Sequence, residues 1–328
     1  MDELDTRYQD HRSAEGPGGG ASVITADATA SQPMTLSLRT RTAQLSAPAF
    51  LAALPAAAYF VVLLGVPLVI LAFYSVLTSG LFEATRPFTV SNYVAAVDSS
   101  VTASLALNSA IYGLATAAVT VVVAVPVAAW LRFTISRFKT VVLFLITASI
   151  FASYLVRIYA WRTILDDNGV INTVLRDAGI IHHPVQLLYD RFAVVVALVH
   201  IFLPYVVLLI YAALAPVTPD YLEAAADLGA SGVRRWTHVI IPLIAAPAVA
   251  SFVFVFVRSA GDYVTPQFLG ATNGSTLGVL AKDQFTVVGN WGYGAAMSIL
   301  MLAAFAGASA ILSIPVRLAG LHKIRFSS

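Results

Sequence analysis

The sequence predicts an all-α polytopic membrane protein with six transmembrane helices. Hydrophobic residues make up 59% of its 328 residues and charged residues only 11%, whereas an ordinary globular domain has about 25% charged residues. Several apolar runs exceed the ~20 residues that a helix needs to cross a bilayer. The net charge of +2 is small, and nothing in the composition indicates a nucleic-acid partner. Cysteine is absent, which excludes disulfides, thiolate metal sites and thiol nucleophiles.

The chain before the first apolar run is predicted to be a disordered cytoplasmic tail. Residues 1–46 are rich in Gly, Ala, Ser, Thr and Pro, with GPGGG at 16–20, and such a segment buries too little apolar surface to offset its ordering entropy. It lacks the apolar core of a signal peptide. Residues 36–46 are compatible with a short helix leading to the membrane. Residues 47–328 are expected to form one transmembrane domain.

Six apolar runs define the expected spans. They lie at about 49–78, 105–131, 140–161, 192–215, 239–260 and 293–318. Most contain proline, which a spanning helix tolerates as a kink where neighbouring groups satisfy the freed carbonyl. Between the spans, DDNGVINTVLRDAGI at 166–180 is expected to form a turn and a short helix. The polar, glycine-rich segment 261–292 is expected to be a loop.

The distribution of Lys and Arg predicts that both termini lie in the cytoplasm. With the N-terminus inside, 12 of the 19 Lys and Arg residues fall on the inner side and seven on the outer side or outer membrane ends. The short loop 132–139 alone carries three of them. Because cytoplasmic loops are enriched in Lys and Arg, this orientation is favoured. It also places the loop 215–238 in the cytoplasm.

That loop carries a short amphipathic segment, APVTPDYLEAAADLGASGVRRWTHVIIP at 215–242. Thr218 is a candidate N-cap for a helix that begins at Pro219, where the missing N–H costs nothing. Gly229 is a natural stop, since glycine tolerates the left-handed position after a helix. A second helix can begin at Ser231 and run into the membrane. A compact helix–turn–helix with an alanine face is suited to docking against another protein.

The same segment resembles the EAA loop of ABC importer permeases. The resemblance rests on Glu223-Ala224-Ala225, then Gly229, then Val239-Ile240-Ile241-Pro242; the family pattern ends Ile-x-Leu-Pro, so Val239 and Ile241 are conservative departures. It implies a coupling helix at 219–229 that docks on a cytoplasmic ATPase. The coupling residues that it implies are Glu223, Ala224, Ala225, Asp227, Gly229 and Pro242. The alternative is an ordinary amphipathic loop helix.

Motifs for catalysis are not recognisable in the chain. A phosphate-binding loop needs Gly-Lys followed by Ser or Thr, and the three lysines follow Phe, Ala and His. The chain is therefore not expected to be an enzyme or to bind a cofactor, and ATP and Mg²⁺ are expected on a partner ATPase. The adjacent pair His182-His183 is expected to be surface decoration rather than a metal site.

Three further blocks, in the same order, resemble spermidine/putrescine permeases. They are Ser153–Trp161 continuing to Gly169–Asn172, then Gly261–Gly270, then Asn290-Trp291 followed by Gly294–Ala296. The resemblance implies a type I importer permease fold in the bacterial inner membrane. It also implies a heterodimeric partner permease, two ATPase subunits, an extracytoplasmic binding protein and a polyamine substrate.

Polar and aromatic groups at the outer membrane edge are candidates for the substrate path. An aromatic side chain beside an acid is one way to hold an organic cation, although belts of aromatic residues and turn acids are also common at such positions. The candidates are Tyr159, Trp161, Asp166, Asp167, Asp262 and Tyr263. Arg157 and Arg258 are charged groups near span ends, with snorkelling or pairing with a nearby acid as the alternative to a pathway role.

Alternative functions remain open at the level of the sequence. Within the importer class, the solute could be an opine, ferric ion or phosphonate. An ion-coupled secondary transporter would need coupling groups in the middle of the membrane, and His200, midway along the fourth run, is the one available.

Overall fold

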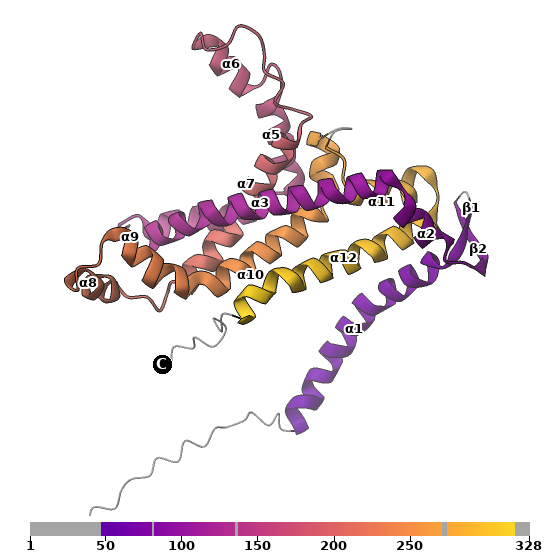
Figure 1. Cartoon of the computed structure of the whole chain (residues 1–328), viewed down its shortest axis with the longest axis horizontal. Coiled ribbons are helices and arrows are strands. Elements are labelled where there is room, and N and C mark those ends of the chain that lie inside the picture. The colour runs from indigo at the N-terminus through magenta and orange to yellow at the C-terminus, as the bar shows by residue number, and fades with distance from the viewer. Residues whose placement is uncertain (1–46, 81, 135–136, 271–273, 319–328) are drawn as a thin grey trace, which may run out of the picture. The chain divides into compact units, whose positions relative to one another are not determined.

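The computed structural model describes residues 47–80, 82–134, 137–270 and 274–318 (Figure 1). The chain divides into two units, Met1–Pro55 and Ala56–Ser328. The described part of the first unit is the start of helix α1 (Ala47–Ser75), and the account below concerns the second. The predicted tail at 1–46, including the possible helix at 36–46, lies outside the described residues.

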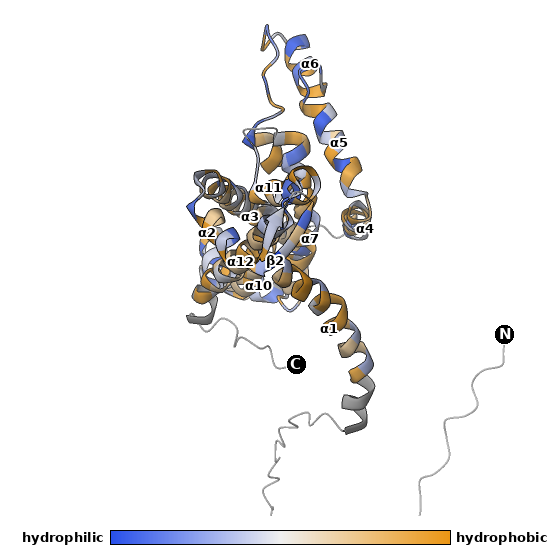
Figure 2. Cartoon of the chain, turned by 90° about the vertical axis from the view of Figure 1, so that its right-hand side faces the viewer, coloured by the Kyte–Doolittle hydropathy of each residue, from blue (hydrophilic) through white to orange (hydrophobic). Residues whose placement is uncertain are grey.

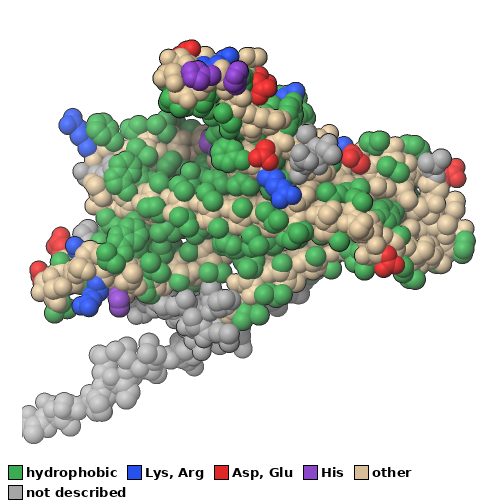
Figure 3. Space-filling view, turned by 45° about the horizontal axis from the view of Figure 1, so that its top comes forward, with side chains coloured by type: hydrophobic (Ala, Val, Ile, Leu, Met, Phe, Trp, Pro, Cys, Tyr) green, Lys and Arg blue, Asp and Glu red, His purple; other side chains and the backbone are tan. Residues whose placement is uncertain are grey.

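Long apolar helices form the body of the second unit. Besides α1, they are α3 (Ser100–Phe133), α7 (Arg191–Ala213), α10 (Ile241–Ala260) and α12 (Trp291–Leu318). These five helices are long and apolar enough to cross a membrane, and a bent helix pair raises the number to six. Hydrophobic residues cover most of their length (Figure 2). On the face in Figure 3, hydrophobic side chains cover much of the surface, and charged side chains and histidines occur in scattered groups, one of them on the projection at the top of the view.

The third predicted span is not one continuous helix. Helix α4 (Lys139–Ile150) ends after twelve residues, and the helical segment Tyr154–Asp177, made of α5 (Tyr154–Leu165) and α6 (Val170–Asp177), continues at an angle of 97°. The expected span 140–161 is therefore broken near its middle. Ser153, with φ −55° and ψ 135°, adopts an extended conformation there and precedes the first turn of α5. In Figure 1, α5 and α6 project away from α3.

The core lies where α3 packs along both α7 and α10. Buried alanines of α3, among them Ala117, Ala124 and Ala128, leave room for the neighbouring helices. Gly113 marks the closest approach, because a Cβ atom there would lie 2.8 Å from Cδ2 of Phe256 and 2.9 Å from Cβ of Ala260. Small residues thus let α3 and α10 approach closely, as is common between membrane helices.

A short hairpin follows α1, which an all-α prediction does not include. Strands β1 (Leu77–Gly80) and β2 (Glu83–Phe88) pair in an antiparallel manner and lead into α2 (Ser91–Asp98). The buried side chain of Asn92 donates to the carbonyls of Ser75 and Leu77 at 3.0 and 2.8 Å. This amide ties the end of α1 to the hairpin and to α2.

The segment expected as a loop at 261–292 is instead largely helical. It contains a π-helical segment η2 (Pro266–Gly270), helix α11 (Leu277–Asp283) and a second π-helical segment η3 (Gln284–Val288). The backbone N–H of Leu277 donates to Oγ of Ser109 on α3 at 3.0 Å. The segment therefore packs back against the core.

Candidate functional site

The loop after α7 folds into the two helices that local sequence signals predict. Helix α8 (Pro219–Asp227) follows Thr218, whose φ of −83° and ψ of 155° suit an N-cap, although its side chain makes no capping hydrogen bond. Gly229 has a φ of +79°, the left-handed conformation expected of it. Ser231 caps α9 (Gly232–Arg235) by accepting from the N–H of Arg234 at 3.4 Å.

Large apolar side chains of α8, α9 and the turn between them are exposed to solvent. Leu228 is 90% exposed, Val233 74% and Tyr221 53%. Between them, Glu223 is exposed, and within the described part of the chain it has no hydrogen-bond or ion-pair partner. Such a surface, with large apolar side chains beside the exposed carboxylates of Asp220, Glu223 and Asp227, has the character of a protein-docking site.

The other predicted coupling residues differ in their exposure to solvent. Ala224 and Asp227 are exposed on α8 beside Glu223, while Ala225 is half-buried. Pro242 is half-buried in the first turn of α10. A π-helical segment, η1 (Trp236–Ile240), joins α9 to α10. The segment 215–242, called the coupling segment below, therefore continues into a spanning helix without a break.

Arg132, at the end of α3, fixes the start of the coupling segment. Its guanidinium donates to the carbonyls of Leu214, Ala215 and Val217 at 3.2, 2.8 and 3.1 Å. These carbonyls lie at the C-terminal end of α7, where a cation is favoured by the helix dipole. Arg132 was not among the residues that the sequence singled out. In the sequence, the position of Arg132 at the end of a span, where a basic loop begins, was the one feature that could have drawn attention to it.

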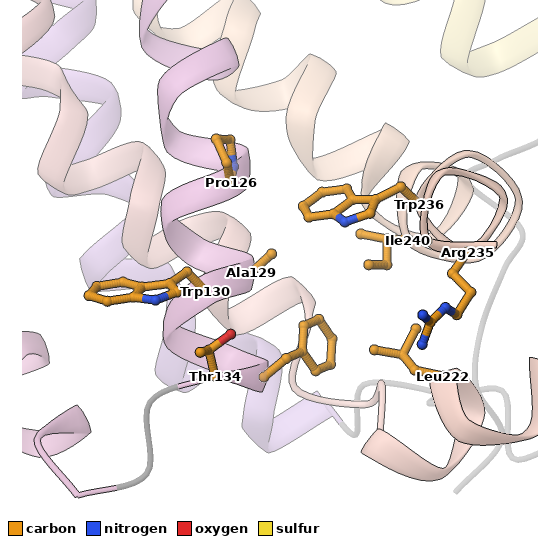
Figure 4. Close-up of a pocket in the computed structure, with 10 residues that line it drawn as sticks. Pro126, Ala129, Trp130, Thr134, Leu222, Arg235, Trp236 and Ile240 are labelled. Atoms are coloured by element: carbon orange, nitrogen blue, oxygen red, sulfur yellow. The ribbon is translucent and has the colours of Figure 1, made fainter. Parts of the chain in front are cut away.

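A cavity of ≈ 370 Å³ lies between α3 and the coupling segment. Pro126, Ala129 and Trp130 of α3 line one part of it, and Leu222, Trp236 and Ile240 of the coupling segment line another (Figure 4). The coupling segment thus faces α3 across this cavity through apolar side chains.

The aromatic candidates of α5 have partners in other elements. The ring of Tyr159 packs against Phe268 of η2, with centroids 5.3 Å apart. Nε1 of Trp161 donates to Nδ1 of His200 on α7 at 3.2 Å. Both aromatic residues thus help to hold α5 against its neighbours, and Tyr159 also remains about half exposed, at 49%.

Asp262 is already engaged by this chain. Its Oδ2 accepts from the hydroxyl of Tyr154 at 2.8 Å and from the N–H of Thr265 at 3.1 Å, and its Oδ1 accepts from the N–H of Val264 at 3.2 Å. The carboxylate therefore joins the start of α5 to the turn after α10. Its neighbour Tyr263 is 44% exposed. The substrate-path role of both residues stays a prediction.

The two acids after α5 behave differently. Asp166 and Tyr159 line one cavity of ≈ 360 Å³, together with Arg162, Thr163, Asn168 and Gly169. Oδ1 of Asp166 also accepts from the N–H of Asn168 at 3.1 Å. Asp167 is exposed and does not line this cavity. The structure thus brings together one acid and one aromatic residue of the predicted path, with an arginine beside them.

A third cavity, of ≈ 380 Å³, opens between α4, α5, α7 and α10. Arg157 and Arg258 line it, among apolar and aromatic side chains that include Tyr205 and Phe254. In the ranges that the structure covers, no cluster of three potential metal-ligating side chains occurs.

Comparisons with known proteins agree on one family. The family described as binding-protein-dependent transport system inner membrane component matches residues 95–321. The spermidine/putrescine transport system permease protein PotB of Haemophilus influenzae is 32% identical over 163 residues, which cover 50% of this chain and 57% of that protein. PotB of Escherichia coli is 29% identical over 238 residues, which cover 70% of this chain and 86% of that protein.

Solved structures show the same fold. A bacterial alginate ABC transporter in complex with an alginate pentasaccharide-bound periplasmic protein contains a chain that superposes with a TM-score of 0.67 at 14% identity. The match covers 82% of this chain and 94% of that chain. The predicted type I importer permease fold is therefore confirmed, with the hairpin and the broken span as additions.

Proposed function

Because the chain belongs to the family of binding-protein-dependent transport system inner membrane components, we propose that it conducts a polyamine of the spermidine/putrescine class into the cell. It is the permease subunit of an ABC importer, a multi-pass protein of the plasma membrane, and not itself an enzyme. The similarity to two spermidine/putrescine permeases is the observation that carries the substrate class.

The importer is proposed to comprise this chain, a second and different permease subunit, two ATPase subunits and an extracytoplasmic binding protein. The ATPase subunits bind ATP and Mg²⁺, and this chain binds no cofactor. The docking surface on α8 and α9 supports the ATPase contact, since it exposes Leu228, Val233 and the free carboxylate of Glu223.

Movement is proposed to reach the membrane through the coupling segment. When ATP closes the ATPase dimer, α8 moves as a lever in its cleft. The hydrogen bonds from Arg132 to the end of α7 pass this motion to α3, and η1 passes it to α10. Because α3, α7 and α10 share one packed core, they swing together and open the path toward the loaded binding protein. Hydrolysis reverses the motion.

The cation is proposed to enter past the C-terminal end of α5. There Tyr159 offers a partly exposed ring and Asp166 a carboxylate in the same cavity. Trp161 and Asp167, in and after α5, and Tyr263, whose neighbour Asp262 contacts the start of α5, are proposed to add aromatic and acidic groups to the path. The binding protein does most of the selection, so a modest number of contacts in the permease is sufficient.

The ATPase activity of the assembled complex in lipid nanodiscs tests this proposal. We expect stimulation that requires both the binding protein and spermidine or putrescine. Stimulation by the binding protein without any polyamine effect would keep the importer and discard the substrate class. Failure of any ATPase subunit to associate would remove the proposed role of α8.

An importer for an anionic solute is a second candidate, and one observation favours it. Arg157 and Arg258 line one cavity among the spanning helices, and two cations there suit an anion better than a polyamine. Uptake of a labelled anion, competed by other anions but not by spermidine, would select this candidate.

A further inference from the structure

The cavity lined by Arg157 and Arg258 lies among the spanning helices. Arg157 is in the first turn of α5, directly after the bend that follows α4. Helix α4 has twelve residues, so at 1.5 Å per residue it rises about 18 Å, well into a hydrocarbon core of about 30 Å. Taking α4 to begin at the cytoplasmic face, we infer that Arg157 lies within the hydrocarbon core rather than at the membrane surface.

Neither guanidinium has an acidic partner in the described ranges. The ion pair that occurs there joins Lys282 to Asp283. Arg157 donates to the carbonyl of Ile201 at a long 3.4 Å, and its Nε is buried without a partner. Asp262 follows Arg258 by four residues, but its oxygens bind the hydroxyl of Tyr154 and backbone N–H groups instead.

An unpaired charge at this depth is costly, and ionisable groups in spanning helices normally face the bundle interior and pair. Arg258, two residues before the end of α10, can extend toward the outer interface. Arg157 cannot do so in the same way, because its Nε is already enclosed. The two arginines therefore need a negative charge, and the described residues of this chain do not supply one.

We propose that a carboxylate from a spanning helix of the second permease subunit enters this cavity and pairs with Arg157 and Arg258. This proposal rests on the two-permease importer proposed above. A protein carboxylate is favoured over a solute because the arginines need a counter-charge throughout the transport cycle, whereas a solute is present only briefly. A lipid phosphate lies at the headgroup level, too far from Arg157. The pairing also removes a positive barrier from the path of a polyamine.

The sequence adds a constraint on the partner. Asp and Glu are absent from the spanning helices α1, α3, α7, α10 and α12 and from α4 and α5 of the bent pair; the acids Asp166, Asp167 and Asp177 follow α5. A second copy of this chain therefore has no carboxylate in a spanning helix to insert. The partner must be a different permease with an acidic residue inside a span, which makes the transmembrane pair a heterodimer.

Photo-crosslinking in the intact importer tests the partner directly. A photoreactive phenylalanine analogue replaces Tyr205, which lines the cavity and is exposed at its mouth. We expect a crosslink to the second permease, in a peptide that contains a membrane-embedded Asp or Glu. The same analogue at Ile311 of α12, which is 66% exposed on a helix that does not line the cavity, is the control. Crosslinks from position 205 to lipid alone, or to a second copy of this chain, would overturn the proposal.

Charge variants test the pairing. Arg157→Gln and Arg258→Gln should each lower the amount of second permease that copurifies with this chain at least fivefold, while Arg157→Lys and Arg258→Lys should retain most of it. Neutralising the partner's crosslinked acid should restore assembly with Arg157→Gln. Arg176→Gln, an exposed change on α6, is the matched control and should leave assembly unchanged.

The outcomes separate this proposal from the proposed function. If the Gln variants assemble normally but shift the concentration of solute needed for uptake, the cavity binds solute and the carboxylate proposal is wrong, while the importer stands. If the wild-type chain recruits no second permease, the proposed subunit arrangement fails first.

Discussion

At Gly229 the coupling segment depends on one backbone conformation. Its φ of +79° lies in the left-handed region, and no atom of the described residues lies within 4 Å of the position that a Cβ would occupy. A side chain there would therefore meet no clash. The left-handed backbone conformation would cost an ordinary residue about 1–2 kcal/mol of conformational free energy. This strain would fall on the turn between α8 and α9.

We expect Gly229→Val to reduce uptake strongly, because the strained turn reorients α8 relative to α9. Gly229→Asn should retain most uptake, since Asn tolerates the left-handed region. Uptake by proteoliposomes and the amount of inserted protein are measured together. Gly179→Val is the matched control: Gly179 has a φ of +69° and equally open surroundings but follows α6. Equal loss in both Val variants would contradict a specific role for Gly229.

Arg132 provides a second prediction for a single residue. Arg132→Gln removes a charged donor from three carbonyls at the end of α7. A hydrogen bond to a charged group contributes about 1.5–3 kcal/mol to stability. A smaller contribution is expected here because Arg132 is only half-buried. We expect ATP hydrolysis to persist while solute carried per ATP falls several-fold, because α3 no longer follows the coupling segment.

The control for this variant lies in the same basic loop. Arg137→Gln changes an exposed arginine that makes no hydrogen bond to any residue with a described position. It should leave the ratio of uptake to hydrolysis unchanged. A proportional fall of uptake and hydrolysis in Arg132→Gln would show that Arg132 supports assembly rather than coupling.

Among the elements, the contact between α3 and α10 leaves no room for an added methyl group. A Cβ at Gly113 would meet the buried ring of Phe256 and Cβ of Ala260. We expect Gly113→Ala to cost about 1–3 kcal/mol through forced repacking and to lower the Tm of the purified complex. Gly307→Ala on α12, where the described part of the chain places no atom within 4 Å of the added Cβ, should leave the Tm nearly unchanged. Similar Tm values for the two variants would contradict the packing argument.

The elements that local chemistry determines were predictable from the sequence. Pro219 begins α8 and Gly229 takes the left-handed turn, because both depend on neighbouring residues alone. The bend at Ser153 was missed, since the run 140–161 is apolar throughout the break and length is the dominant signal for a span. The hairpin between α1 and α2 was missed because its pairing depends on tertiary contacts such as those of Asn92.

The candidate site was predictable only in part, for a related reason. Arg132 contacts carbonyls that lie 82 to 85 residues away, and Tyr154 reaches Asp262 across 108 residues. A single sequence shows that such residues are polar and near a membrane edge, but not which groups they meet. Asp262 was therefore chosen for its charge, whereas the fold uses that charge to join two segments.

For the whole molecule, the predicted orientation can be tested because the chain has no cysteine. We expect Leu228→Cys, at a position that is 90% exposed, to react with a membrane-impermeant maleimide only in inside-out vesicles. His182→Cys, exposed after α6, should react only in right-side-out vesicles. The reverse pattern would place α8 away from any cytoplasmic ATPase and contradict the proposed mechanism.

Helix α1 has a consequence for how the protein is made. Most side chains of its apolar stretch, Leu54–Ser75, are exposed in the folded chain. Its contacts gather at its C-terminal end, where Ser75 is buried and the ring centroid of Tyr74 lies 6.3 Å from that of Trp291. Its insertion therefore depends mainly on its own hydrophobicity rather than on helices that are translated later. α3, in contrast, carries Tyr112, Thr116 and Thr120, whose buried hydroxyls are enclosed by neighbours. During synthesis, α1 can settle in lipid as soon as it leaves the ribosome, whereas α3 reaches its final environment only after α7 and α10 have been translated.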